Sequence, residues 1–203
     1  PRVYFAESRS IHDANNGTSL PGTLRRFEGG GPTGDADVDA AYDNTGATYE
    51  AYADFWGRDS FDGAGATLRS TVHYSLHYCN AFWNGTQLAF GDGTGDSTCL
   101  PLARAVDLTA HELTHAITEL ESGLIYSGES GGLSESISDV FGAFVEARND
   151  GGRTGSLTVS PDTWLFGEDV WPPFGRSLCD PASDGASMDL WSPGAGNVDV
   201  HYS

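Results

Sequence analysis

The chain has 203 residues, which is long enough to bury a hydrophobic core without a disulfide framework. Hydrophobic residues make up 38% of it, too many for a disordered chain, so the formal net charge of −19 must belong to the surface. All ten basic side chains are Arg, against 29 carboxylates, and this balance argues against nucleic acid or an anionic membrane as a partner. Bound cations and adaptation to salt would each explain the acidity, and the sequence leaves both open.

The apolar runs, the start of the chain and the cysteines bear on whether the protein is secreted. No apolar run reaches membrane-spanning length and no signal-peptide pattern opens the chain, while Pro1 is compatible with a processed mature start. Cys79 and Cys99 flank the segment 80–98, which reads as a hairpin whose ends meet, so we expect the two to form a disulfide. Cys179 is left over, and a buried thiol and a disulfide to another chain remain equally open for it.

The first half of the chain has the texture of strands and turns. It is rich in Gly, Asp, Asn and Thr, and short alternating apolar stretches at 69–78 and 87–90 predict strands. Alanine and aromatic residues at helical spacing predict a helix within 42–55. We therefore expect a β-rich N-terminal lobe over residues 1–100.

Two amphipathic helices are predicted after residue 100. Apolar residues recur every three or four positions over 106–120, and a second such pattern covers 133–147. The segment 123–132 between them reads as a turn, and the tail over 149–203 as loops around short elements. The apolar side of the second helix is expected to consist of Ile137, Val140, Phe141, Phe144 and Val145.

The first of these helices carries a metal-binding pattern. In His111-Glu112-Leu113-Thr114-His115 two imidazoles stand at i and i+4, so they share a face and can reach one ion. The pattern alone is moderately specific, and two surface histidines are its bland alternative.

The second helix supports a metal site and indicates that the metal is zinc. Glu135 and Asp139 also stand at i and i+4, at the edge away from the apolar stripe. If the helices pack as an antiparallel pair, Glu135 supplies the third ligand and Asp139 orients a histidine. Two His and one Glu leave one position of a single zinc ion open for water, which is the arrangement of a catalytic site.

These residues resemble the active-site core of the thermolysin-like zinc metalloproteases, the gluzincins. The resemblance extends from about residue 72 onward and includes a terminal Asp199-Val200-His201 that is closer to the vibriolysin and pseudolysin branch. It rests on His111-Glu112-Leu113-Thr114-His115, Gly123-Leu124-Ile125-Tyr126, Leu133-Ser134-Glu135-Ser136-Ile137-Ser138-Asp139, Val72-His73-Tyr74-Ser75, Asn80-Ala81-Phe82-Trp83-Asn84-Gly85, Arg176-Ser177, Asp180-Pro181 and Asp199-Val200-His201-Tyr202-Ser203.

Catalytic roles follow from chemistry and from this resemblance. Glu112 stands beside the zinc ligands and can take a proton from water and pass it to the leaving amine. The resemblance implies that Tyr126 and His201 donate to the carbonyl oxygen, with Asp199 fixing the tautomer of His201. A packed tyrosine and a surface histidine are the alternatives.

The resemblance also implies substrate contacts. Asn80 and Ala81 would hold the extended peptide backbone, and Arg176 would bind a substrate carbonyl. A pocket favouring a bulky apolar residue after the scissile bond would be built from Leu102, Leu108, Phe166 and Val170. For each of these four a plain core position is an equally open interpretation.

A calcium site is implied as well. Thr163 and Leu165 stand where thermolysin has acids, so we expect one calcium ion rather than a double site. Its carboxylates would come from Asp107, Glu146 and Glu168, assisted by Asp162 or the Leu165 carbonyl.

Two competing interpretations remain. Gly128-Glu129-Ser130-Gly131-Gly132 fits the Gly-x-Ser-x-Gly pattern of a serine hydrolase, but this stretch joins two helices rather than a strand and a helix. The chain also ends at Ser203, where the family continues into a helical lobe, so a nicked or truncated part that binds zinc and a partner lobe is an alternative.

We expect an α+β, thermolysin-like fold, with a largely antiparallel sheet followed over 101–203 by the zinc-bearing helix pair. The expected function is a secreted endopeptidase acting on polypeptide substrates.

Overall fold

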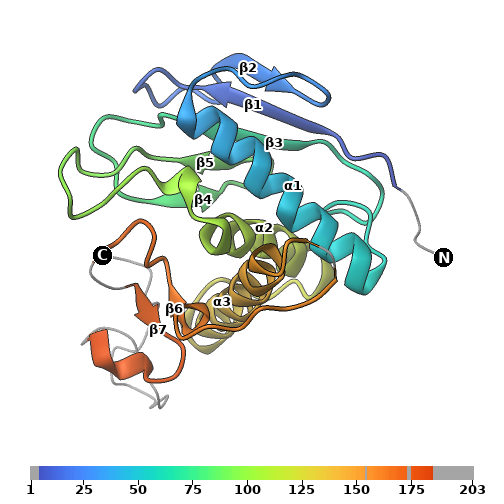
Figure 1. Ribbon diagram of the computed structural model, residues 1–203, viewed down its shortest axis with the longest axis vertical. Coiled ribbons are helices and arrows are strands. Elements are labelled where there is room, and N and C mark those ends of the chain that lie inside the picture. The colour runs from blue at the N-terminus through green and yellow to red at the C-terminus, as the bar shows by residue number, and fades with distance from the viewer. Residues whose placement is uncertain (1–4, 154, 173–174, 185–203) are drawn as a thin grey trace.

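The computed structural model describes residues 5–153, 155–172 and 175–184, and all structural statements below concern these residues. A five-stranded sheet forms the upper part of the molecule in Figure 1, with helix α1 across one face and helices α2 and α3 below it. The strand order is β2-β1-β3-β5-β4. The strands are β1 (Arg9–Asp13), β2 (Thr23–Phe27), β3 (Leu68–Val72), β4 (Ala81–Trp83) and β5 (Leu88–Phe90).

The expectation of a largely antiparallel sheet is wrong, because the sheet is mixed. Strands β1 and β3 run parallel, as do β3 and β5, while the two outer pairs, β1–β2 and β4–β5, are antiparallel. Parallel neighbours need a long crossover, and the chain supplies one each time. Strand β2 and helix α1 lie between β1 and β3, and β4 lies between β3 and β5.

The predicted N-terminal helix is confirmed and is longer than expected. Helix α1 spans Ala36–Trp56, begins at the N-cap Asp35 and ends at Gly57, whose φ of 64° is left-handed. Its inner face packs with the sheet and with α2 in one core. That core includes Ile11, Val38, Leu68, Val72, Leu88, Phe90, Leu102 and Leu108.

The metal-bearing helices are confirmed as a packed pair. Helix α2 spans Val106–Glu121 and α3 spans Gly128–Asp150. A Cβ at Gly142 would lie 2.8 Å from the carbonyl oxygen of Asp107, so glycine is needed where α3 approaches α2. The turn predicted over 123–132 is wrong in its second half, because α3 already begins at Gly128.

Helix α3 turns its small and polar side inward, in agreement with the expectation that Glu135 and Asp139 face the first helix of the pair. Ser134, Glu135, Ser138 and Asp139 are buried, whereas 59% of Val140 is exposed. Further along the stripe, Phe141 and Phe144 stack on aromatic side chains at the end of α1.

The chain continues from α3 through short elements. These are η2 (Asp162–Trp164), the hairpin β6 (Leu165–Phe166) and β7 (Arg176–Ser177), and η3 (Pro181–Asp184), with η1 (Leu102–Arg104) preceding α2. The predicted disulfide between Cys79 and Cys99 is confirmed, and Cys179 is a free, exposed thiol. Among the described residues no helix is both long and apolar enough to cross a membrane.

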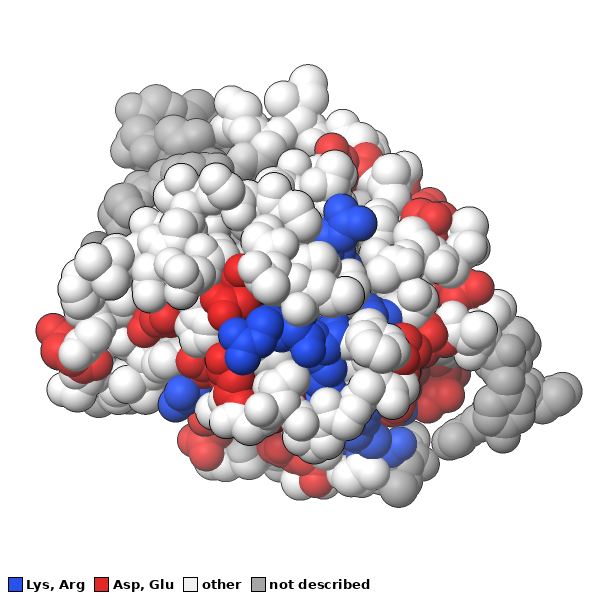
Figure 2. Space-filling model, turned by 90° about the horizontal axis from the view of Figure 1, so that it is seen from above, with Lys and Arg blue, Asp and Glu red and all other residues white. Residues whose placement is uncertain are grey.

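Three arginines near β1 and β2 are paired with carboxylates. Figure 2 views the face that carries β1 and β2, where Arg side chains lie in a band bordered by Asp and Glu. The ion pairs Arg9–Glu28, Arg25–Asp13 and Arg26–Asp39 have N–O distances of 2.7, 2.5 and 3.0 Å. The band is therefore neutralised locally within an acidic surface.

Candidate zinc centre

Three side chains from α2 and α3 converge at one point. The Nε2 atoms of His111 and His115 lie 2.9 Å apart, and each is 3.3 Å from an oxygen of Glu135. Two imidazole nitrogens and a carboxylate that meet in this way form the donor set of a zinc site with an open position. The donor atoms of these three residues all lie within 4.8 Å of one another, so the residues present fit the ion.

The other ring nitrogen of each histidine is held by α3. Nδ1 of His111 is 2.8 Å from Oδ1 of Asp139, and Nδ1 of His115 is 3.2 Å from the hydroxyl of Ser134 and 3.3 Å from that of Ser138. These contacts fix both rings with Nε2 directed inward. The two serines were missed by sequence reasoning, although their spacing around Glu135 places them on the same helix face.

The site attracts positive charge. Burial disfavours the imidazolium form of His111, but hydrogen bonds to Asp139 and Glu135 outweigh it and raise its pKa to about 9. Burial also opposes ionisation of Asp139, yet His111 and Arg176 lower its pKa to about 2. The Nε2 atoms therefore face a field that favours a cation, either a proton or a metal.

Glu112 lies beside the ligands and is fixed by the neighbouring strand. Its Oε2 accepts a hydrogen bond of 3.1 Å from the backbone N–H of Trp83, and burial raises its pKa above the usual range. The hydroxyl of Tyr126 donates to Glu135, and the Tyr126 ring packs edge-on against His115. A carboxylate with a raised pKa is suited to take up a proton and release it.

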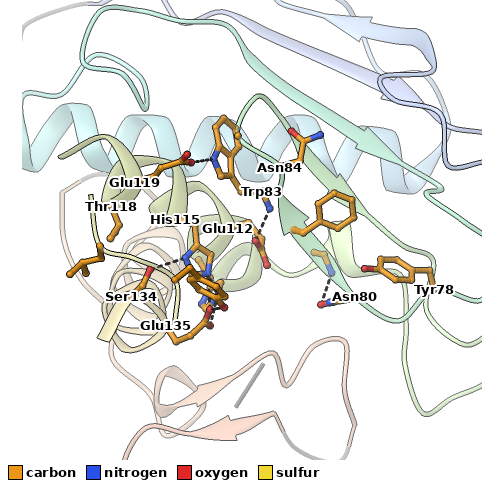
Figure 3. A pocket seen from close by; sticks show the side chains of 16 residues that line it. Tyr78, Asn80, Trp83, Asn84, Glu112, His115, Thr118, Glu119, Ser134 and Glu135 are labelled. Carbon is orange, nitrogen blue, oxygen red and sulfur yellow. Dashed lines mark hydrogen bonds and ion pairs between the residues drawn. The ribbon is translucent and has the colours of Figure 1, made fainter. Parts of the chain in front are cut away.

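A cavity of about 770 Å³ opens over this group. Figure 3 shows β4 along one side and the zinc-ligand helices along the other, with the Glu112 carboxylate between them. Asn80 and Ala81, which were expected to hold a substrate backbone, line the cavity together with Trp83, whose indole N–H donates a hydrogen bond of 2.8 Å to the carboxylate of Glu119. The hydrogen bond between Glu119 and the Trp83 indole was not predicted from the sequence.

The other predicted substrate contacts lie elsewhere. Arg176 binds the Asp139 carboxylate with both Nη2, at 2.6 Å, and Nε, at 3.2 Å, and packs over the Phe166 ring. Asp199 and His201 lie outside the described residues. The four residues expected to form the apolar pocket are buried in the main core, and none is among the described residues that line the cavity: Leu102, Leu108, Phe166 and Val170.

Comparison with known proteins decides the family. The model of the thermolysin metallopeptidase catalytic domain matches residues 3–119, and that of the thermolysin metallopeptidase alpha-helical domain matches residues 122–203. The chain belongs to the thermolysin metallopeptidase family.

Individual relatives agree with this assignment. Bacillolysin of Brevibacillus brevis is 48% identical over 179 residues, which cover 86% of this chain and 31% of the relative. An extracellular metalloprotease of Pectobacterium carotovorum subsp. carotovorum is 47% identical over 80% of this chain and 45% of the relative. The solved precursor of protealysin, a metalloproteinase from Serratia proteamaculans, superposes with a TM-score of 0.75 at 39% identity, covering 85% of this chain and 53% of that one. The chain thus spans between about a third and half of the length of these proteins.

The thermolysin family is zinc-dependent and stabilised by calcium, and a second acidic group suits the latter ion. Glu146 and Glu168 lie together with Asp169, which sequence reasoning missed. Oε2 of Glu146 and Oε2 of Glu168 are buried without a hydrogen-bond partner, and burial followed by the nearby charge of Asp107 raises the pKa of both. Asp107 itself accepts from the backbone N–H groups of residues 108 and 167. Asp162 is exposed on η2 and is not a member of the group.

The Gly-x-Ser-x-Gly pattern around Ser130 lacks the preceding strand that a serine hydrolase needs. Ser130 lies in the first turn of α3 and follows the loop 122–127 rather than a strand. Its hydroxyl donates to the carbonyl oxygens of Ile125 and Ser127 at 2.5 and 2.9 Å. The Ser130 hydroxyl therefore hydrogen-bonds backbone carbonyl groups at the start of α3, which is a common structural role of serine.

Proposed function

We propose that this chain carries the catalytic cleft of a secreted zinc endopeptidase that hydrolyses internal peptide bonds in polypeptide substrates. The observation that carries the proposal is the convergence of His111, His115 and Glu135 beside the buried carboxylate of Glu112 at the floor of an open cavity. The names of the relatives, one of them an extracellular metalloprotease, support both the activity and the location outside the cell.

In this proposal His111, His115 and Glu135 hold one zinc ion, which when bound lowers the pKa of water and polarises a carbonyl. Glu112 takes the proton from the attacking water, because it lies next to the ligands and its pKa is raised by burial. It then returns the proton to the leaving amine. Asp139 keeps the His111 ring in place throughout.

The remaining predicted roles concern the substrate. Tyr126 lines the cavity beside the proposed zinc ligands, and its hydroxyl can donate to a carbonyl oxygen that gains negative charge. His201, with its tautomer set by Asp199, is proposed to assist. Ala81 at the start of the outer strand β4, and Asn80 directly before it, would pair with an extended peptide, as edge strands commonly do.

The side-chain preference and the calcium site are proposed as follows. A bulky apolar substrate residue would be favoured after the scissile bond. Its pocket would form when four core residues repack, Leu102, Leu108, Phe166 and Val170. Arg176 would bind a substrate carbonyl. One calcium ion would be held by Asp107, Glu146 and Glu168, with Asp169 as a further ligand in the place first given to Asp162. The longer relatives make the rest of the helical domain a candidate partner for this chain.

Proteolysis of an unstructured protein tests the proposal. Glu112→Gln should retain zinc and lose activity by about 10²- to 10⁴-fold, because only the proton acceptor is removed. Glu129→Gln, an exposed change on α3, is the matched control, and Ser130→Ala tests the serine alternative. Activity that survives a zinc chelator, or that is lost in Ser130→Ala alone, would overturn the proposal. Zinc binding without cleavage would favour the alternative of a part that needs its partner lobe.

A further inference from the structure

The disulfide between Cys79 and Cys99 lies beside the cleft, and the mechanism above gives it no role. Cys79 directly precedes Asn80, at the start of the strand proposed to bind substrate, and Cys99 precedes the segment that leads through η1 into α2. The bond therefore joins the substrate-binding edge to the approach to the zinc helix. Cys99 is only 2% exposed and belongs to the main core.

Strand β4 is attached to α2 at its end, through the hydrogen bonds of Trp83 to Glu112 and Glu119, and these do not fix its start. It is the outer strand of the sheet and pairs on one side only, with β5, through three residue pairs. Before it, the carbonyl oxygens of Asn80 and Tyr78 accept hydrogen bonds of 3.0 and 3.1 Å from the N–H groups of Gly91 and Gly93. An edge strand this short can shift unless its end is fixed.

The sulfur of Cys79 is also held from the opposite side. The indole N–H of Trp171 lies 3.1 Å from the Cys79 sulfur, and the Trp171 ring packs near Phe166 with centroids 6.4 Å apart. Phe166 in turn contacts the ring of His111, with centroids 4.9 Å apart. The disulfide thus connects the edge strand to the side chains behind the first zinc ligand.

We propose that the Cys79–Cys99 disulfide and Trp171 are positioning residues that hold β4 and Asn80 at the correct distance from α2 for an extended peptide. The inference rests on the proposed function and adds to it a determinant of substrate affinity. Loss of the bond frees the start of β4, so it weakens the main-chain pairing of a long peptide. The zinc ligands lie on α2 and α3, and Glu112 accepts its hydrogen bond from Trp83 at the far end of β4, so we expect both to stay in place.

The test compares the double variant Cys79→Ser/Cys99→Ser with Cys179→Ser, which removes only the exposed free thiol. Kinetics are measured in the full chain with a long unstructured peptide and with a blocked dipeptide that cannot pair along β4. We expect KM for the long peptide to rise roughly tenfold with kcat within about twofold. KM for the dipeptide, the zinc content and all values for Cys179→Ser should stay unchanged.

Two further measurements keep the inference falsifiable. Trp171→Phe keeps an aromatic side chain but removes the N–H donor to Cys79, so it should also raise KM for the long peptide, and it decides the matter if the double variant does not fold. Binding of the long peptide is also measured in the Glu112→Gln background, with and without the disulfide. Equal affinities there, equal effects on both substrates, or loss of zinc would overturn the inference. A wild type that binds the peptide but never cleaves it would instead overturn the proposed function.

Discussion

Oδ1 of Asp139 lies 2.8 Å from Nδ1 of His111 and also 2.6 Å from Nη2 of Arg176. One buried carboxylate on α3 therefore fixes the ring of a proposed zinc ligand on α2 and at the same time holds an arginine from β7. Removal of its charge would take a charged hydrogen-bond partner from both His111 and Arg176.

Asp139→Asn should weaken zinc binding by about 10- to 100-fold, because an amide cannot hold His111 as a carboxylate does. The measurement is zinc occupancy in competition with a chelator of known affinity. Glu129→Gln changes an exposed carboxylate on the same helix and should leave zinc affinity as it is. Unchanged affinity in Asp139→Asn would show that the ligand is oriented by other contacts.

Most of the zinc group was predictable from the sequence, because it depends on spacing within helices. His111 and His115 share a face of α2 by their i, i+4 spacing, and Glu135 and Asp139 do so on α3. Only the packing of the two helices had to be assumed. The hydrogen bond from the Trp83 backbone to Glu112 could not be predicted, because it depends on the register of β4 against α2.

The apolar stripe of α3 is only partly buried. The sequence placed Glu135 and Asp139 away from this stripe, and the structure buries both, while along the stripe Val145 is buried and Val140 is largely exposed. Hydrophobic periodicity gives the apolar side of a helix but not how much of that side a neighbouring element covers. The parallel strand pairs were missed for a related reason, since single-strand patterns carry no information on crossover direction.

His73 directly follows β3 and lies between two carboxylates. Its Nδ1 is 2.8 Å from Asp92 and its Nε2 is 3.2 Å from Asp35, the N-cap of α1. The hydrogen bond to Asp92 outweighs the effect of burial, and the pKa of His73 rises from 6.5 to about 9. Since the folded pKa is raised, the stabilisation is fully present below pH 6.5 and is lost as pH rises through about 9.

His73→Asn should therefore lower the free energy of unfolding by about 1 to 2 kcal/mol at neutral pH, a value reduced for partial exposure to solvent. The loss should shrink as the pH approaches about 10, where the wild type has also lost its charge. Urea unfolding at several pH values gives both numbers. His77→Asn is the matched control, because His77 also has a positive φ, of 53°, but is exposed. A deficit that does not depend on pH would mean that packing, rather than charge, accounts for the role of His73.

The acidic group of Glu146, Glu168 and Asp169 allows a prediction in which one substitution has opposite effects in two buffers. Without calcium, burial and then the nearby charges of Asp107 and of the neighbouring carboxylates raise the pKa of Glu146 and Glu168. Glu146→Gln removes part of the repulsion between these charges and should raise the melting temperature in a calcium chelator. In calcium the same change removes a ligand and should lower the melting temperature relative to wild type, because bound ion stabilises the folded state.

Two further variants decide which carboxylate completes this site. Asp169→Asn should weaken the stabilisation by calcium, whereas Asp162→Asn should leave it unchanged, because Asp162 is exposed and lies outside the group. Thermal unfolding over a calcium titration measures both. The reverse result would restore Asp162 as the ligand, and it would require η2 to move toward α3 when calcium binds. If Glu146→Gln destabilises the protein equally in calcium and in chelator, the buried carboxylates stabilise the fold without an ion.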